Sequence, residues 1–472
     1  MAIVGLVGLG ATAGFASTTF TDVEEGRYYT DAVQWAADNG VTTGTSATTF
    51  SPENAVTRGQ NVTFAYRYDQ NVVQPALDNI DDRFDGLETL DELSCTATQV
   101  VINDSGWRCA DPVLKPSFRA AINRTLEDLG PESYYMSVAI GADGNPVISH
   151  QGLDIDLALY VCNDPTCTTG TNRELVTAGD VGYYSSVAIG ADGNPVISHG
   201  GGTGSDLELY VCDNPACGSG TNRTLEEDGF VGWYSSVAIG ADGNPVISHR
   251  DGANFDLELF VCADAACTSG TNQTLEEDGS VGSYSSVAIG ADGNPVISHK
   301  DEGNNDLELY VCDNPTCTTG TNQTLEENGL AGNYSSVAIG ADGNPVISHF
   351  NGTGSDLELY VCADAACTSG TNQTLEENGD VGRYSSVAIG ADGNPVISHQ
   401  DATNFDLELY VCGNPTCTSG TNQTLETTGE VGNYSSVAIG ADGIPVISHR
   451  DDTFWDVELY VGSATTYTIT FE

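Results

Sequence analysis

All seven histidines of the chain fall at one position of a repeat of about 50 residues. Each repeat also carries a tyrosine before its first apolar run and an aspartate shortly after the histidine. Together these side chains offer an aromatic face for stacking and donors and acceptors for hydroxyl groups, which suits a sugar ligand. The alternative is structural: His and Asp bond to each other across a hairpin, and Tyr packs between repeats. The residues are His150, His199, His249, His299, His349, His399 and His449; Tyr184, Tyr234, Tyr284, Tyr334, Tyr384 and Tyr434; and Asp156, Asp206, Asp256, Asp306, Asp356, Asp406 and Asp456.

Near-identical repeats argue against an active site, because catalysis requires a constellation of unlike groups. A glycan hydrolase needs two carboxyl groups whose pKa values are held apart. No such pair is confined to one repeat. We therefore predict no catalytic residues and no enzyme activity, with a propeller-type glycan hydrolase or lyase as the alternative.

The 14 cysteines favour export and disulfide bonding. Six repeats carry one Cys-x4-Cys pair each, and we expect each pair to close a short loop that adds roughly 2 kcal/mol of stability. Zinc is the competing interpretation, but no further ligand lies nearby in sequence. The expected bonds are Cys162–Cys167, Cys212–Cys217, Cys262–Cys267, Cys312–Cys317, Cys362–Cys367 and Cys412–Cys417, with Cys95–Cys109 outside the repeats.

The chain is strongly acidic, with 67 Asp and Glu against 14 Lys and Arg and a formal net charge of −53. This charge repels nucleic acid and anionic lipid, so we exclude both as partners. No stretch after the N-terminus has the ~20 apolar residues that cross a bilayer. We predict no cofactor and no metal site; calcium at Asp251, Asn254 and Asp256 stays open, although residues 200–205 lack equivalents.

One repeat contains four short strands, which is typical of a propeller blade. The segment 184–190 alternates in size, 191–195 is a turn, 196–199 and 206–212 are further strands, and 221–225 is the fourth. We predict a mainly β fold in which residues 113–472 form a seven-bladed propeller. Eight blades are the alternative if 99–128 form a partial blade, and a β-solenoid is another. Residues 123–128 copy the fourth strand, which predicts ring closure by strand exchange.

The repeats differ from one another mainly at two places. One is the residue after the histidine, and the other is the residue before the first-strand tyrosine. In an up-and-down blade the loops at these two places emerge at the same end. Because binding residues concentrate in loops on a rigid scaffold, we predict a ligand face there.

The N-terminal region contains a different pattern. Phe20-Thr-Asp22-Val precedes an amphipathic helix at 31–38, and Phe50-Ser-Pro and Val56-Thr57-Arg58-Gly follow it. Residues 18–68 resemble one S-layer homology (SLH) motif along nearly their whole length. The resemblance implies anchoring to bacterial cell-wall polysaccharide, with glycan contacts from Thr57, Arg58 and Asp22.

Three other segments complete the domain organisation. Residues 1–17 resemble a secretory signal peptide without a basic start, or alternatively form a buried strand. We expect residues 69–94 to form a short helical stalk, because residues 70–93 have a heptad-like apolar seam. This seam either associates with another copy of the chain or packs on the repeat domain. Residues 95–112 predict a small Cys-bracketed segment.

These features predict a secreted protein on the cell wall or cell surface. One segment anchors the chain to wall polysaccharide, and the propeller displays a multivalent binding or adhesion surface for a glycan or a protein. The alternatives are the glycan-active enzyme and a structural surface-layer tile without a ligand.

Overall fold

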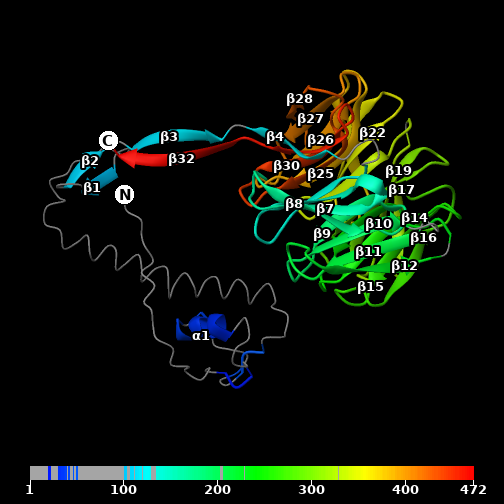
Figure 1. Ribbon diagram of the computed structural model, residues 1–472, viewed down its shortest axis with the longest axis horizontal. Helices are drawn as coiled ribbons and strands as arrows, with labels where there is room; N and C mark the ends of the chain where they lie inside the picture. Colours follow the sequence, from blue (N-terminus) through cyan, green and yellow to red (C-terminus); the bar gives the residue numbers. More distant parts are fainter. Residues whose placement is uncertain are drawn as a thin grey trace. The chain divides into compact units, whose positions relative to one another are not determined.

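The computed structural model of the protein (Figure 1) describes most of the repeat region. The described residues are 134–463 apart from 202–205, 228 and 328; 121–127; the helix or strand backbone at 30–32, 100–103, 107–110, 112–119, 128 and 464–471; and 20–22, 33–39, 41–42, 46 and 49–51. By contacts the chain divides into one unit of residues 1–115 with 467–472 and a second of residues 116–466. Each unit is described by itself.

The larger unit is a seven-bladed β-propeller, and each blade is a four-stranded antiparallel sheet (Figure 1). Neighbouring blades contact each other through their first strands, which therefore surround the central channel. In chain order the strands of the first six blades are β5 (Ser137–Ile140), β6 (Pro146–Gln151), β7 (Leu157–Cys162), β8 (Gly170–Val176); β9 (Val181–Ile189), β10 (Pro195–Gly201), β11 (Asp206–Cys212), β12 (Gly220–Glu226); β13 (Trp233–Ile239), β14 (Pro245–Asp251), β15 (Asp256–Cys262), β16 (Gly270–Glu276); β17 (Ser283–Ile289), β18 (Pro295–Asp301), β19 (Asp306–Cys312), β20 (Gly320–Glu326); β21 (Asn333–Ile339), β22 (Pro345–Asn351), β23 (Asp356–Cys362), β24 (Gly370–Glu376); and β25 (Val381–Ile389), β26 (Pro395–Asp401), β27 (Asp406–Cys412), β28 (Gly420–Glu426).

The seventh blade joins the two ends of the repeat region. It contains β29 (Asn433–Ile439), β30 (Pro445–Asp451), β31 (Asp456–Val461) and, as its outer strand, β4 (Ile122–Asp128). In Figure 1 the cyan β4 lies beside the orange and red strands of this blade. The prediction of seven blades closed by strand exchange is confirmed. The eight-bladed alternative is not realised, because β1 (Val100–Asn103) pairs with β2 (Trp107–Ala110), and β3 (Pro112–Arg119) pairs with β32 (Ala464–Phe471).

Two turns define one end of each blade. Gly193 adopts φ 83°, which a glycine tolerates without strain, and the Asp192 carboxylate accepts the Asn194 N–H at 3.0 Å. The second turn lies between the third and fourth strands, where Cys212 and Cys217 form a disulfide with a Cα–Cα distance of 5.0 Å. All six predicted disulfides within the repeats are present.

The hydrophobic core lies between blades. Leu157 and Leu159 of one blade pack against Val187 and Ile197 of the next, and Tyr210 completes the same cluster. The leucines and Ile197 are wholly buried. Each such side chain contributes about 1.5–3 kcal/mol when it leaves water. A single repeat cannot bury this surface alone, so the stacked neighbours stabilise one another.

The smaller unit contains the helix α1 (Thr30–Asp38), which agrees with the helix expected at 31–38. Val33 on this helix packs with Phe20, and the rings of Phe20 and Phe50 lie 5.7 Å apart. Within the described part of the chain, no helix has the length and apolar character needed to cross a bilayer. Several predictions fall outside the described residues: the signal peptide at 1–17, the contacts of Thr57 and Arg58, the stalk at 69–94 and the Cys95–Cys109 bond.

Candidate functional site

In the second to seventh blades, the first strand carries an irregularity at the tyrosine that lines the channel. In β13 the register against β14 shifts between Trp233 and Ser236, and Tyr234 lies between them with φ 53°. A bulge of this kind bends a strand and re-aims a side chain. The ring tyrosines of the other blades have φ values from 52° to 58°.

Seven tyrosines form a closed aromatic ring around the channel. Successive ring centroids lie 4.4–4.8 Å apart from Tyr135 to Tyr434, and 5.3 Å separates Tyr434 from Tyr135. Six of the seven were predicted as ligand-face residues. Tyr135 was not, because the first repeat reads Tyr134-Tyr135-Met136 and has Met136 where the others have serine. Aligning Ser137-Val138-Ala139-Ile140 with the other repeats would have identified it.

Burial raises the pKa of six of the seven phenol groups in this ring and keeps them neutral. Burial raises the pKa of Tyr184, and the neighbouring phenols of Tyr135 and Tyr234 raise it further. The same causes act on Tyr284, where burial is again the largest. Neutral hydroxyls both donate and accept hydrogen bonds, so the channel mouth presents polar groups on aromatic rings.

Small first-strand serines explain why the blades approach one another closely. Ser235 Oγ donates to the carbonyl of Tyr184 in the preceding blade at 2.9 Å, and Ser186 Oγ accepts the N–H of Val237 at 3.2 Å. These bonds recur around the ring and hold the tyrosines at a fixed spacing.

The two variable positions of the repeat are cross-strand neighbours. Trp233 pairs with Arg250, and Ser283 pairs with Lys300.

We call one end of the propeller the variable face. It is formed by the loops that join the second and third strands of each blade and by the loops that join the fourth strand to the first strand of the next blade. All exposed large apolar side chains of the described propeller belong to these loops. They are Leu153, Phe230, Phe255, Leu330, Phe405, Phe454 and Trp455.

In most blades the residue after the histidine reaches across to the next blade. Arg250 donates to Ser283 Oγ at 2.7 Å, Lys300 donates to Asn333 Oδ1 at 2.8 Å, and Gln400 donates to the Val431 carbonyl at 2.9 Å. These contacts fill the space between adjacent blades at the variable face.

The second blade has Gly200 at this position and leaves the space open. The result is a cleft of about 220 Å³ lined by aromatic side chains of three blades. Its walls are Tyr135, Tyr183, Tyr184, Gly200, Gly201, Val231 and Trp233. The described residues that line the cleft include no carboxylate; they offer aromatic stacking surfaces and phenol hydroxyls.

The histidines lie inside the blades and not on the exposed variable face. All seven imidazoles are 0% exposed. Each Nε2 faces the amide oxygen of an asparagine on the fourth strand of its blade, as in His249 and Asn272 at 3.2 Å. The third-strand aspartates are not the partners: Asp256 pairs through the backbone with Asp251. Sequence reasoning proposed the histidines as ligand residues on an exposed face, whereas the structure buries them inside the blades.

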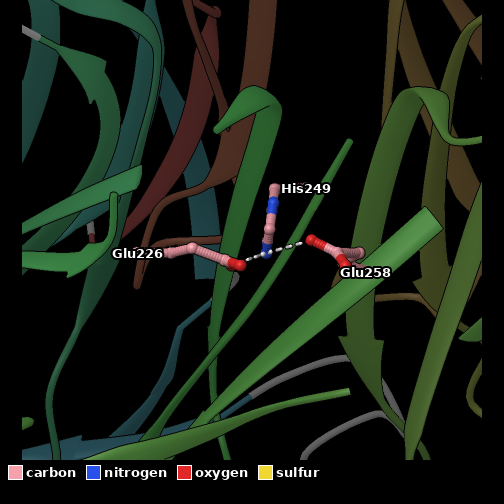
Figure 2. Close-up of side chains that lie close together, drawn as sticks. All are labelled: Glu226, His249 and Glu258. Atoms are coloured by element: carbon pink, nitrogen blue, oxygen red, sulfur yellow. Dashed lines mark ion pairs between the residues drawn. The ribbon is translucent and has the colours of Figure 1, made fainter. Parts of the chain in front are cut away.

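Glutamates surround the buried histidines. His249 Nε2 lies 3.7 Å from Glu226 Oε2 and 3.8 Å from Glu258 Oε2, and Figure 2 shows the imidazole between the two carboxylates. Glu226 ends the fourth strand of the preceding blade, and Glu258 is on the third strand of the same blade as His249. Asn272 Nδ2 donates to both carboxylates, at 2.5 and 3.0 Å. Sequence reasoning missed these glutamates, because the cluster combines two repeats.

Burial controls the protonation of these clusters. It lowers the pKa of His249 and His299 to about 4, so both imidazoles are neutral at pH 7. It raises the pKa of Glu276 to about 8, and the charge of Glu308 adds to this effect.

The loop considered for calcium is satisfied by its own groups. The Asp251 carboxylate accepts hydrogen bonds from the N–H of Ala253 and Asn254 and from Asn254 Nδ2, at 2.7–3.2 Å. It therefore forms an Asp-centred turn, which is sufficient to explain the residues at these positions.

In the smaller unit, Asp22 organises a turn. Its carboxylate oxygens accept the N–H groups of Phe50 at 2.8 Å and Ser51 at 2.6 Å, and these bonds lower the pKa of Asp22. Asp22 thus holds the segment that follows the helix against Phe20.

The described fold defines a β-propeller protein with an N-terminal helical module. Residues 19–60 match the S-layer homology domain family. SLH domains bind cell-wall polysaccharide, so the protein is a cell-surface protein anchored to the cell wall.

The propeller is similar in fold to several solved structures. They include the NanB sialidase of Streptococcus pneumoniae, 10% identical, covering 73% of this chain and 70% of that chain with a TM-score of 0.42. The intramolecular trans-sialidase of Ruminococcus gnavus is 10% identical over 70% of this chain and 94% of that chain, with a TM-score of 0.41. The hydrazine synthase of Kuenenia stuttgartiensis is 12% identical over 73% and 97%, with a TM-score of 0.49. No curated protein matches the chain. At these levels the similarity gives no information on function.

Proposed function

We propose that the propeller is a non-enzymatic carbohydrate-binding module that the SLH domain displays on the cell wall. The observation that carries this proposal is the aromatic cleft beside Gly200. Trp233 and Tyr183 provide flat apolar surfaces for a sugar ring, and the ring tyrosines provide hydroxyls. Its volume of about 220 Å³ is below that of clefts for drug-sized ligands, roughly 300–1,000 Å³, so it suits one sugar residue of a longer glycan.

The rest of the variable face supports additional contacts with the same glycan. Phe255, Phe405 and Trp455 are 46%, 44% and 43% exposed and occupy equivalent loop positions in three blades. Exposed apolar side chains gathered on one face mark an interaction surface. Weak contacts at several blades add up when one chain or one surface engages them together.

Wall attachment depends on residues of the SLH motif in this proposal. Arg58 forms paired hydrogen bonds with an acidic group of the wall polysaccharide, Thr57 adds a hydroxyl contact, and Asp22 positions the neighbouring turn. Self-association through residues 70–93 would place several propellers on one patch of wall. The substitution Arg58→Ala should release the full chain from purified cell wall without changing the propeller's glycan binding.

A glycan array with the full chain tests the binding function. Wild-type protein should bind a defined set of glycans, and Trp233→Ala should weaken binding about tenfold or more, because removing a buried aromatic anchor typically costs over 1 kcal/mol. Ser283→Ala, at the matching position of the next blade, is the control and should bind normally. Absence of binding to any glycan would favour the structural tile, and shortening of a bound glycan would favour the enzyme.

A further inference from the structure

Among the described residues, three boundaries between blades contain a compact cluster of two glutamates and one histidine. The clusters are Glu226, His249 and Glu258; Glu276, His299 and Glu308; and Glu426, His449 and Glu458. In each cluster one glutamate comes from the fourth strand of one blade, and the other two residues come from the next blade. The histidines are wholly buried, and the described glutamates of the third strands are also buried.

The geometry of the clusters matches that of a metal site. One atom from each residue lies within 4.8 Å of the others, and the six His Nε2–Glu Oε2 distances are 3.5–3.9 Å. Nitrogen and oxygen ligands bind Zn²⁺ at about 2.0–2.2 Å, so two ligands of one ion are about 3–4 Å apart. Figure 2 shows the Nε2 atom of His249 directed towards both carboxylates.

A fourth ligand is also in place. Asn272 Oδ1 lies 3.2 Å from His249 Nε2, and Asn322 Oδ1 lies 3.3 Å from His299 Nε2. Asn123 Oδ1 occupies the same place at His449, at 3.2 Å. One nitrogen and three oxygens from four side chains form a four-coordinate set, whereas Ca²⁺ prefers six to eight oxygen ligands.

We propose that each of the three clusters binds one Zn²⁺ ion between two blades. The ligands are His Nε2, one carboxylate oxygen of each glutamate and the asparagine amide oxygen. The ion offsets the negative charge of the two carboxylates that it binds, and a neutral imidazole is the form that binds a metal. Because its ligands come from two blades, the ion adds a link between repeats that also contact each other through apolar packing and side-chain hydrogen bonds.

Two other blade boundaries provide internal controls. At His199 the preceding blade has Val176 at the position that Glu226 occupies in the complete cluster. Glu208 on the third strand is still present, but the fourth-strand glutamate is replaced. At His150 the third strand has Ala158 in place of Glu258. Neither boundary forms a complete cluster among the described residues, so neither should hold an ion.

The experiment measures zinc bound to the full chain. Protein stripped with EDTA is incubated with ZnCl₂ in excess CaCl₂, which occupies exposed carboxylates, then desalted and analysed for zinc per chain by mass spectrometry. The wild type should retain at least three ions and unfold at a higher temperature with zinc than without it. Glu258→Gln should retain one ion fewer, and Glu208→Gln, the matched control at the incomplete boundary, should retain the wild-type number.

A gain-of-site variant covers the case in which Glu258→Gln does not fold. Val176→Glu completes the cluster at His199 and should add one ion to the wild-type number. Retention of fewer than three ions by the wild type, or equal zinc content in Glu258→Gln and Glu208→Gln, would overturn the proposal. So would an unchanged zinc content in Val176→Glu when Glu258→Gln cannot be purified folded.

Discussion

Asn123 on β4 and His449 on β30 are separated by 326 residues in sequence, yet Asn123 Oδ1 lies 3.2 Å from His449 Nε2. The same asparagine donates to Glu458 at 3.0 Å and to Glu426. Asn372 makes the same contacts in the fifth blade, whose four strands are consecutive in sequence. Asn123 therefore repeats these contacts at the junction where the two ends of the ring meet. The propeller closes through side chains as well as through the β4–β31 ladder.

The junction should be the most sensitive place for loss of this asparagine. Asn123→Ala leaves buried carboxylates without a donor, at a cost of about 1–3 kcal/mol, and also weakens the strand that closes the ring. Asn372→Ala makes the same polar change without touching the junction. Urea unfolding should show a larger loss of stability for Asn123→Ala, and equal losses would mean that closure depends on the backbone ladder alone.

The disulfides should stabilise each blade separately. Replacing Cys262 and Cys267 together by serine should lower the free energy of unfolding by about 2 kcal/mol, because the short loop between them regains freedom in the unfolded chain. The seventh blade has Gly462 after Val461 and no such pair, so a blade can fold without it. Chemical denaturation with and without reductant measures the effect. An equal drop for wild type and variant on reduction would contradict an independent contribution from each bond.

The tyrosine ring predicts an alkaline limit to stability. Burial, and then neighbouring phenols, raise the folded-state pKa of Tyr184 and Tyr284 above the unfolded value of about 10. This stabilisation is fully present below about pH 10 and is lost as the pH rises towards the folded-state pKa. Absorbance at 295 nm, which reports phenolate, should show a late phase that coincides with loss of the β-sheet circular dichroism signal.

Tyr284→Phe provides the matched control for this titration. The variant keeps the aromatic contacts of Tyr284 and should lower the late phase by the absorbance of one phenol. Ionisation of all 20 tyrosines in one step near pH 10, with the sheet signal retained, would show that the ring is open to solvent.

The sequence was sufficient to predict elements that one repeat determines. The third strand expected at 206–212 is β11, and the Asp192-Gly193 turn and the Cys212–Cys217 loop are where the pattern placed them. These features depend on strand alternation, turn chemistry and cysteine spacing, which are all local. The closing strand was also predictable, because residues 123–127 copy residues 222–226.

Features that join two repeats could not be read from one repeat. Glu226 and His249 belong to different blades, and only stacking brings them together. The bulge at Tyr234 has no sequence signature, because a tyrosine at φ 53° is not an expected turn residue. The cleft exists because Gly200 has no side chain. This could be recognised only after the structure showed that Arg250 and Gln400 fill the equivalent space in other blades.

The cleft can be closed with glutamine, the residue that two other blades have at the position of Gly200. Gln400 donates to the Val431 carbonyl at 2.9 Å, and Gln151 makes the same bond to Val181 at 2.8 Å. Gly200→Gln should therefore reach the Val231 carbonyl and fill the space beside Trp233. A Cβ at position 200 would meet the Gly232 carbonyl at 3.2 Å, so a small adjustment is needed, but stability should be nearly unchanged.

The affinity of Gly200→Gln for the best glycan on the array, compared with that of the wild type by titration calorimetry, tests the account most directly. Carbohydrate binding in the cleft predicts a loss of affinity of about tenfold or more, with an unchanged melting temperature. Wild-type affinity in a folded Gly200→Gln protein would contradict it, because the space in which we place the sugar would then be filled by the glutamine.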